Sequence, residues 1–277
     1  MSKYTILLPP SEGKRDGGHT RQTWQDIAND SAANAFRRLN PHRLALIEGL
    51  QTAIHENSEQ AFVESDTPSA LQKLFNVKGN ELQATMEANL HLMDSSLSPA
   101  IERYTGVMFQ YLDYNSLPTA IRHAFDGHTI LFSGLWGILR PTDLIPNYRL
   151  KVDAKLPNIG SVTPYWKPRV SAVLNPLLTG HVVWDLLPGA HRKVWDGKAQ
   201  IQARWQVKFV QKNGAGVYKT VTHWSKALKG ALVRFICKHD VVDPAAFAQF
   251  EHPLGYGFHA EMSTMSVTGG ELVFVKE

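Results

Sequence analysis

The chain has 277 residues, of which 43% are hydrophobic and 19% charged, and its formal net charge is +4. This composition is typical of a globular protein with a sizeable core and excludes a disordered chain. A single cysteine, Cys237, excludes an internal disulfide framework and a cysteine-rich zinc site. No apolar segment is long enough for a membrane helix, and we expect no secretory signal at the N-terminus. We therefore expect a cytoplasmic monomer with no membrane partner, no metal and no cofactor.

The charge is distributed unevenly along the chain. Residues 140–240 carry 17 Lys and Arg but only 5 acidic residues, whereas residues 1–139 and 241–277 are each net acidic. A basic block of this length favours a polyanionic partner or an anionic ligand. A basic surface balanced by an acidic surface of the same fold explains the numbers equally well.

The chain opens with a short aliphatic run, residues 4–8, that predicts a buried strand ending at Pro9-Pro10. The loop that follows places Lys14 and Arg15 just beyond the carboxyl end of this strand, where anion-binding groups are common. A solvated basic loop is the alternative. A helical pattern then runs over residues 30–55, with a break at Asn40-Pro41.

Residues 67–91 contain two helical patterns joined by a tight hairpin and predict a helix-hairpin-helix. In such a unit, the hairpin and the N-terminus of the second helix present backbone N–H groups to a phosphate. Glycines usually flank the central apolar residue of the hairpin, but Asn and Lys stand here, and Lys tolerates a left-handed φ poorly. Two core helices joined by a turn is the alternative. The residues that we expect at the DNA backbone are Lys73, Asn76, Lys78, Gly79 and Asn80.

Short helices are expected near 98–104 and 117–125, and from residue 128 the pattern becomes mixed α/β. Predicted strands cover 128–132, 148–152, 181–186 and 271–276, and a hairpin joins 201–210 to 217–221. Predicted helices cover 165–178, with Pro168 in the first turn, and 223–238. We therefore predict a single mixed α/β domain over residues 1–277, with a central mixed sheet, surrounding helices and the helix-hairpin-helix in its N-terminal half.

Residues 133–150 form the most unusual stretch of the chain. Gly134 and Gly137 are expected to open a helical turn, and Arg140 precedes a proline. Arg149 alternates with apolar neighbours and is expected to point inward or into a cleft, where a buried guanidinium needs an acidic partner or an anion. Asp143 stands near enough in sequence to pair with either arginine, so a purely structural ion pair is the alternative.

The late helix carries three basic residues on one broad side, Lys226, Lys229 and Arg234, with Trp224 nearby. Basic groups next to an aromatic side chain are typical of a nucleic-acid surface. A solvated helix face is the alternative.

Four stretches together resemble the YaaA peroxide stress protein family: ILLPPSEGK at residue 6, SGLWGILRPTDLIPNYRL at 133, WSKALKGALVRFI at 224 and GGELVF at 269. The resemblance implies a mixed α/β fold peculiar to that family, with a helix-hairpin-helix and a positively charged cleft. It also implies binding of double-stranded DNA and protection against hydrogen peroxide linked to limiting free iron. We expect branched DNA to be bound as well. The matching positions include Lys14, Arg140, Asp143, Tyr148, Arg149 and the three basic residues of the late helix.

The favoured hypothesis is a DNA-binding stress protein that is not an enzyme. The alternative is an enzyme that holds a phosphorylated or otherwise anionic small molecule through Lys14, Arg140 and Arg149, with Tyr148 or Glu271 for proton chemistry. An iron-binding protein is the least supported class, since ligand-type side chains are scattered and cysteine is nearly absent.

Overall fold

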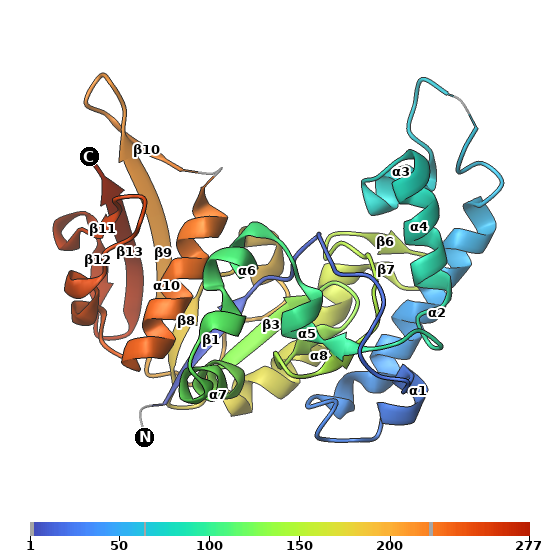
Figure 1. The fold of residues 1–277 in the computed structure, drawn as a ribbon, viewed down its shortest axis with the longest axis horizontal. Coiled ribbons are helices and arrows are strands. Elements are labelled where there is room, and N and C mark those ends of the chain that lie inside the picture. The colour runs from blue at the N-terminus through green and yellow to red at the C-terminus, as the bar shows by residue number, and fades with distance from the viewer. Residues whose placement is uncertain (1–2, 64, 222–223) are drawn as a thin grey trace.

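A computed structural model describes residues 3–63, 65–221 and 224–277 (Figure 1). Its centre is a nine-stranded sheet with the order β11-β13-β9-β8-β1-β3-β4, in which β10 also pairs with β9 and β12 with β13. Strands β3, β1, β8, β9 and β13 run parallel, and the antiparallel strands lie around them. The sheet is thus mixed, as predicted.

The strands of the main sheet are β1 (Tyr4–Leu8), β3 (Thr129–Ser133), β4 (Gly137–Leu139), β8 (Val182–Asp185), β9 (Ala203–Lys212), β10 (Tyr218–Thr220), β11 (Gly257–Phe258), β12 (Thr264–Ser266) and β13 (Gly269–Lys276). Two small sheets pair β2 (Ser98–Pro99) with β5 (Leu144–Ile145) and β6 (Lys155–Leu156) with β7 (Gly160–Ser161).

The α-helices are α1 (Trp24–Ile27), α2 (Asn40–Asn57), α3 (Ala70–Phe75), α4 (Gly79–Leu90), α5 (Ala100–Arg103), α6 (Val107–Leu112), α7 (Thr119–His128), α8 (Val162–Leu177), α9 (Gly189–Arg192) and α10 (Ser225–His239). Short 3-10 helices cover Arg37–Leu39, Tyr114–Ser116, Pro244–Gln249 and Ala260–Met262.

The central strands β1, β3 and β8 are buried along their whole length, because helices and loops cover the sheet. Their near-continuous apolar sequences are typical of parallel strands covered on both faces. Helix α10 packs against α6 and α7, whereas α3 and α4 pack against α2. Figure 1 shows α3 and α4 projecting beside α2 at one end of the molecule, whereas α10 lies nearer the other end, which β9 and β13 form, and α6 and α7 lie near the middle.

The helix predicted over residues 30–55 is wrong in its first part. Residues 31–36 form turns, and the long helix α2 begins at Asn40 with Pro41 in its first turn. The turns are held by Arg43, which is buried and donates hydrogen bonds to the carbonyl oxygens of Trp136 and Ile138. Its Nη1 also donates to the amide oxygens of Asn34 and Asn40. The predicted break is therefore the start of the helix, where proline is tolerated.

The prediction of a helical turn at Gly134 and Gly137 is also wrong, because the segment is a β-hairpin in which Ser133 pairs with Gly137. Gly137 has a φ of 71°, and a Cβ atom there would meet the Trp166 ring at 3.0 Å. Residues 148–152 are not a strand. Helix α8 begins at Val162, which places Pro168 inside the helix rather than in its first turn.

The remaining predicted elements are confirmed within a few residues, although residue 223, the predicted start of the late helix, lies outside the described residues. In the part of the chain that the structure describes, we find no helix with the length and apolar character needed to cross a membrane.

Candidate functional site

A cleft of about 450 Å³ lies beyond the ends of the central strands. Its walls come from the loops that follow β1 and β8, the start of α6, residues 148–153 and the first turn of α10. The chain leaves β1 toward β3 on one side and later returns to β8 on the other side, so β1 marks the topological switch of the sheet. The crevice beyond the carboxyl ends of parallel strands at such a point is where α/β proteins bind ligands.

Lys14 lies in this cleft, held by the backbone of its own loop. Its Nζ donates to the carbonyl oxygen of Ser11 at 2.8 Å and lies 4.4 Å from the centre of the Tyr148 ring. Burial, reinforced by the nearby charge of Arg149, lowers the pKa of Lys14 to about 7. The amine is therefore poised between its charged and neutral forms at neutral pH.

A chain of buried hydroxyl groups lies beside Lys14. The Tyr148 hydroxyl is 2.7 Å from both the Ser133 hydroxyl at the end of β3 and the Tyr104 hydroxyl. Burial raises the pKa of Tyr148 to about 12, so the group is a neutral hydrogen-bonding phenol at pH 7. The loop that follows β1 can pack against the start of α6 because Gly106 has no side chain. A Cβ atom on Gly106 would lie 2.3 Å from the Ser11 Oγ.

Four further basic side chains line the cleft besides Lys14. They are Arg149, Lys151, Lys226 and Lys229, and the carboxylates among the lining residues are Glu12 and Asp153. Lys229 donates to the carbonyl oxygen of Leu186 at 2.8 Å, and burial, with Arg192 nearby, lowers its pKa to about 8. The lining therefore has more cationic than anionic side chains, a charge balance that favours anions.

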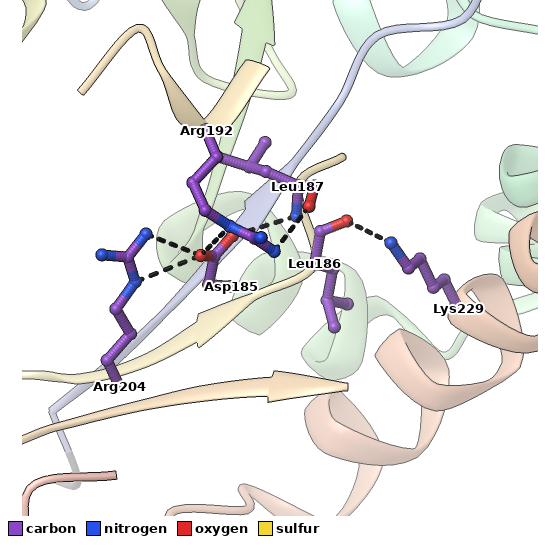
Figure 2. Close-up of polar contacts among 6 residues, drawn as sticks. All are labelled: Asp185, Leu186, Leu187, Arg192, Arg204 and Lys229. Atoms are coloured by element: carbon purple, nitrogen blue, oxygen red, sulfur yellow. Dashed lines mark hydrogen bonds and ion pairs between the residues drawn. The ribbon is translucent and has the colours of Figure 1, made fainter. Parts of the chain in front are cut away.

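The loop between β8 and α9 is fixed by a buried carboxylate, Asp185 (Figure 2). Its Oδ2 accepts hydrogen bonds from Arg192 and Arg204 at 2.7–3.1 Å, and its Oδ1 accepts the backbone N–H of Leu187. Arg192 also donates to the carbonyl oxygen of Leu187. Figure 2 shows Lys229 reaching the same loop from α10, which ties both walls of the cleft together.

His191, at the cleft wall in α9, is the histidine among the lining residues. Burial lowers its pKa to about 4, so the imidazole is neutral at pH 7. Its Nδ1 is buried and has no hydrogen-bond partner within the described residues.

The predicted hairpin unit is joined to the cleft through Arg149. The side chain of Asn89 in α4 accepts the backbone N–H of Arg149 and donates to its carbonyl oxygen. The Arg149 guanidinium in turn bonds Glu81 in the first turn of α4 at 2.7 Å. The second helix of the hairpin unit and the cleft are therefore neighbouring parts of one surface.

The hairpin itself adopts a turn that its sequence permits. Asn76 closes α3 with a left-handed φ of 56°, and Gly79 has a φ of 57°, whereas Lys78 is extended with a φ of −146°. The two left-handed positions of the turn are thus occupied by Asn76 and by Gly79, one residue later than in the usual hairpin. Lys78 has an extended backbone and is not strained. The side chains of Lys73, Lys78 and Asn80 are exposed.

Besides the five residues of the hairpin unit, three further candidate residues lie outside the cleft lining. Arg15 lies on the far side of the loop, where its backbone pairs with Arg103. Arg140 donates to the carbonyl oxygens of Gly127 and Thr129, at the amino end of β3 and hence opposite the cleft. Arg234 donates to the carbonyl oxygens of Leu112 and Asp113 and to the Ser116 hydroxyl.

Asp143 pairs with neither arginine side chain through a hydrogen bond. Its carboxylate accepts the backbone N–H groups of Ala35 and Arg140, and burial raises its pKa. Because the Arg140 guanidinium lies at the amino end of β3, it cannot bind the same small anion as Lys14 and Arg149 in the cleft. This differs from the expectation for an enzyme that holds an anionic ligand through all three residues. Glu271 lies on β13 near Lys208 and is not a lining residue of the cleft.

Four residues of the site were not identified from the sequence, namely Tyr104, Lys151, His191 and Asp185. The one local signal was an acidic residue at the end of the apolar strand β8, since a charge placed at the end of a buried strand needs partners. No group of three or more His, Cys, Asp or Glu residues in the described ranges could hold a metal ion.

Comparisons with known proteins agree with the resemblance noted in the sequence. Residues 4–262 match the model of the family described as peroxide stress protein YaaA. The UPF0246 protein SCO2297 of Streptomyces coelicolor is 32% identical over 92% of both chains. The uncharacterized protein Cj0984 of Campylobacter jejuni is 28% identical over 85% of both chains, and a UPF0246 protein of Neisseria gonorrhoeae is 27% identical over 85% of this chain and 89% of its own. The chain belongs to the YaaA family of peroxide stress proteins.

Proposed function

We propose that the protein binds the phosphate backbone of double-stranded or branched DNA without strong sequence preference, and thereby limits iron-dependent oxidative damage during peroxide stress. One observation carries the proposal: basic side chains from segments far apart in the sequence meet in a single cleft, which the hairpin unit adjoins. Phosphate contacts of this kind position a duplex but do not read its bases.

The two parts of the surface have different roles in this proposal. The cleft supplies Arg149, Lys226 and Lys229 as cations for phosphate. The hairpin supplies the exposed Lys78 and the free backbone N–H groups at the start of α4, where the helix dipole favours an anion. Asn89 and Glu81 hold α4 against Arg149. In this proposal, one continuous stretch of the DNA backbone therefore contacts both the hairpin and the cleft.

The test is fluorescence anisotropy with labelled duplexes of two unrelated sequences and with a four-way junction, over a salt series. The expected result is similar affinity for both sequences, with the logarithm of the association constant falling linearly as the logarithm of salt concentration rises. No binding at low salt, or an affinity indifferent to salt, would overturn the proposal.

A matched pair of charge reversals locates the binding surface. Lys226→Glu places a negative charge at the exposed rim of the cleft and should weaken binding. Lys167→Glu makes the same change at an exposed position of α8, outside the cleft lining, and should leave affinity near that of the unaltered protein at equal salt. Equal losses in both variants would place the DNA elsewhere.

A second candidate is an enzyme that acts on a phosphorylated small molecule. The observation in its favour is the hydroxyl chain of Ser133, Tyr148 and Tyr104, which backbone binding alone does not require. Thermal unfolding in the presence of sugar phosphates tests it, since a ligand that binds the folded state raises the midpoint. An unchanged midpoint at millimolar ligand would remove this candidate.

A further inference from the structure

Lys14 has a more constrained amine than DNA backbone binding needs. Its Nζ donates hydrogen bonds to the carbonyl oxygens of Ser11 and Glu12, at 2.8 and 3.4 Å. Both carbonyl groups belong to the loop that follows β1, so this loop orients the amine. A neutral amine has two hydrogens, and these two contacts use both while leaving the nitrogen lone pair free.

The surroundings of Lys14 favour the neutral amine. Burial is the main cause of its lowered pKa of about 7, and the positive charges of Arg149 and Arg103 add to the effect, whereas Glu12 opposes it. An ordinary lysine is almost entirely protonated at neutral pH and is a poor nucleophile, whereas a lysine made neutral by its surroundings attacks carbonyl carbons.

The cleft around Lys14 has the chemistry to hold a phosphate next to such a carbonyl. Arg149, Lys226 and Lys229 line it together with Lys14, and its volume of about 450 Å³ lies in the range of small-ligand pockets. The Tyr148 ring, whose hydroxyl is bonded to Ser133 and Tyr104, forms the wall of the cleft 4.4 Å from the Lys14 Nζ.

We propose that Lys14 is a nucleophile toward aldehydes that carry phosphate, and that its substrate is the ring-opened abasic nucleotide of DNA. The proposal rests on the proposed DNA-binding function, which brings such a nucleotide to the cleft. It adds an activity: cleavage of the strand on the 3′ side of an abasic site.

The reaction balances without an oxidant, a reductant or a metal. The Lys14 Nζ adds to the C1′ aldehyde carbon, and loss of one water molecule gives an imine. The imine acidifies C2′, whose proton leaves to water as the C3′–O bond breaks and the 3′ phosphate departs with the bonding electrons. Hydrolysis of the imine then returns free Lys14 and leaves an unsaturated aldehyde on the 5′ fragment.

The experiment traps the imine by reduction. A 5′-labelled duplex with one abasic site is incubated with the full-length protein and sodium cyanoborohydride, and a parallel arm uses free 2-deoxyribose 5-phosphate. We expect a covalent adduct stable to denaturation, which peptide mass spectrometry assigns to Lys14, and a cleaved strand when the reductant is omitted. An adduct in the sugar-phosphate arm alone supports the nucleophile but overturns the abasic DNA substrate.

The variant Lys14→Arg keeps the positive charge but removes the nucleophilic amine, so the adduct and the strand cleavage should be lost. Lys167→Arg, on the exposed face of α8, is the matched control and should leave both unchanged. An adduct that survives in Lys14→Arg, or that maps to Lys229, would overturn the assignment.

A duplex with a tetrahydrofuran in place of the abasic sugar separates this proposal from the proposed function, because it has no aldehyde. Anisotropy with this duplex reports binding alone. Binding without any adduct or cleavage on abasic DNA overturns the nucleophile and leaves DNA binding standing. Absence of binding to both duplexes overturns the proposed DNA binding. If the protein also forms no adduct with 2-deoxyribose 5-phosphate, the nucleophilic role of Lys14 is overturned as well.

Discussion

The side chain of Asn89 hydrogen-bonds both backbone polar groups of Arg149, at 3.0 Å to its N–H and 3.1 Å to its carbonyl oxygen. Asn89 is fully buried in α4, whereas Arg149 lies at the cleft. This pair therefore sets the position of the hairpin unit relative to the basic cleft.

Replacing Asn89 by Ala should lower the free energy of unfolding by about 1–3 kcal/mol, since both backbone groups of Arg149 lose their partner. Chemical denaturation measures the change. Gln83→Ala, at an exposed position of the same helix, should change stability by less than about 0.5 kcal/mol. Equal stability of the two variants would mean that water replaces the Asn89 bonds.

Lys78→Glu should weaken DNA binding, because it removes an attraction and adds a repulsion where α4 begins. The salt dependence of the association constant should become less steep by about one phosphate contact. Anisotropy of the variant beside Lys167→Glu checks this, since both carry the same net charge. Unchanged affinity would remove the hairpin from the binding surface.

The parts of the fold that could be predicted are those whose cause is local. The strand Tyr4–Leu8 is an aliphatic run stopped by prolines, and α3 and α4 show two apolar stripes around a turn. The start of α2 was misplaced because the turns before it are held by Arg43, whose carbonyl partners lie more than ninety residues away.

The candidate site was only partly predictable for the same reason. Lys14 could be found because it follows a buried strand, and Lys229 because it stands in a basic helix. Arg140 and Arg234 have the same sequence character, yet their guanidinium groups bond main-chain carbonyl oxygens outside the cleft. Nothing in the local pattern distinguishes a cation that lines the cleft from one that lies outside it.

Asp185→Asn should destabilise the protein by about 3 kcal/mol, because it leaves Arg192 and Arg204 facing an amide in place of a carboxylate. This value is the lower end of the free-energy loss expected when a buried ion pair is broken, because both guanidinium groups are partly exposed. Thermal unfolding measures the loss. Glu277→Gln breaks an exposed pair with Lys212 and should leave the midpoint of thermal unfolding nearly unchanged.

Cys237 should be unreactive in the folded protein. It is buried in α10, and burial raises the pKa of its thiol to about 12, so the reactive thiolate is scarce at neutral pH. Iodoacetamide at pH 7.5 should modify the thiol only after unfolding. Rapid labelling of the native protein, or its oxidation by dilute peroxide, would instead make Cys237 a candidate sensor.

The lowered pKa of Lys14 makes stability depend on pH in a defined direction. Its charged form is disfavoured in the folded state, with a pKa of about 7 against 10.5 for the ordinary group, so the unfolded chain binds more protons between these values. The contribution of Lys14 to stability should therefore rise as pH increases from about 7 to 10.5, and the full penalty applies below pH 7.

The variant Lys14→Met removes this titration while keeping most of the side-chain volume. Denaturation at several pH values should show the variant gaining most over the unaltered protein near pH 6 and losing that advantage by pH 10. The groups facing Lys14 are Glu12, Arg103, Arg149, Tyr104 and Tyr148. Because they are present in both proteins, the difference between the two pH profiles isolates the amine. A constant difference across this range would show that Lys14 keeps an ordinary pKa, and would also withdraw the neutral amine on which its nucleophilic role depends.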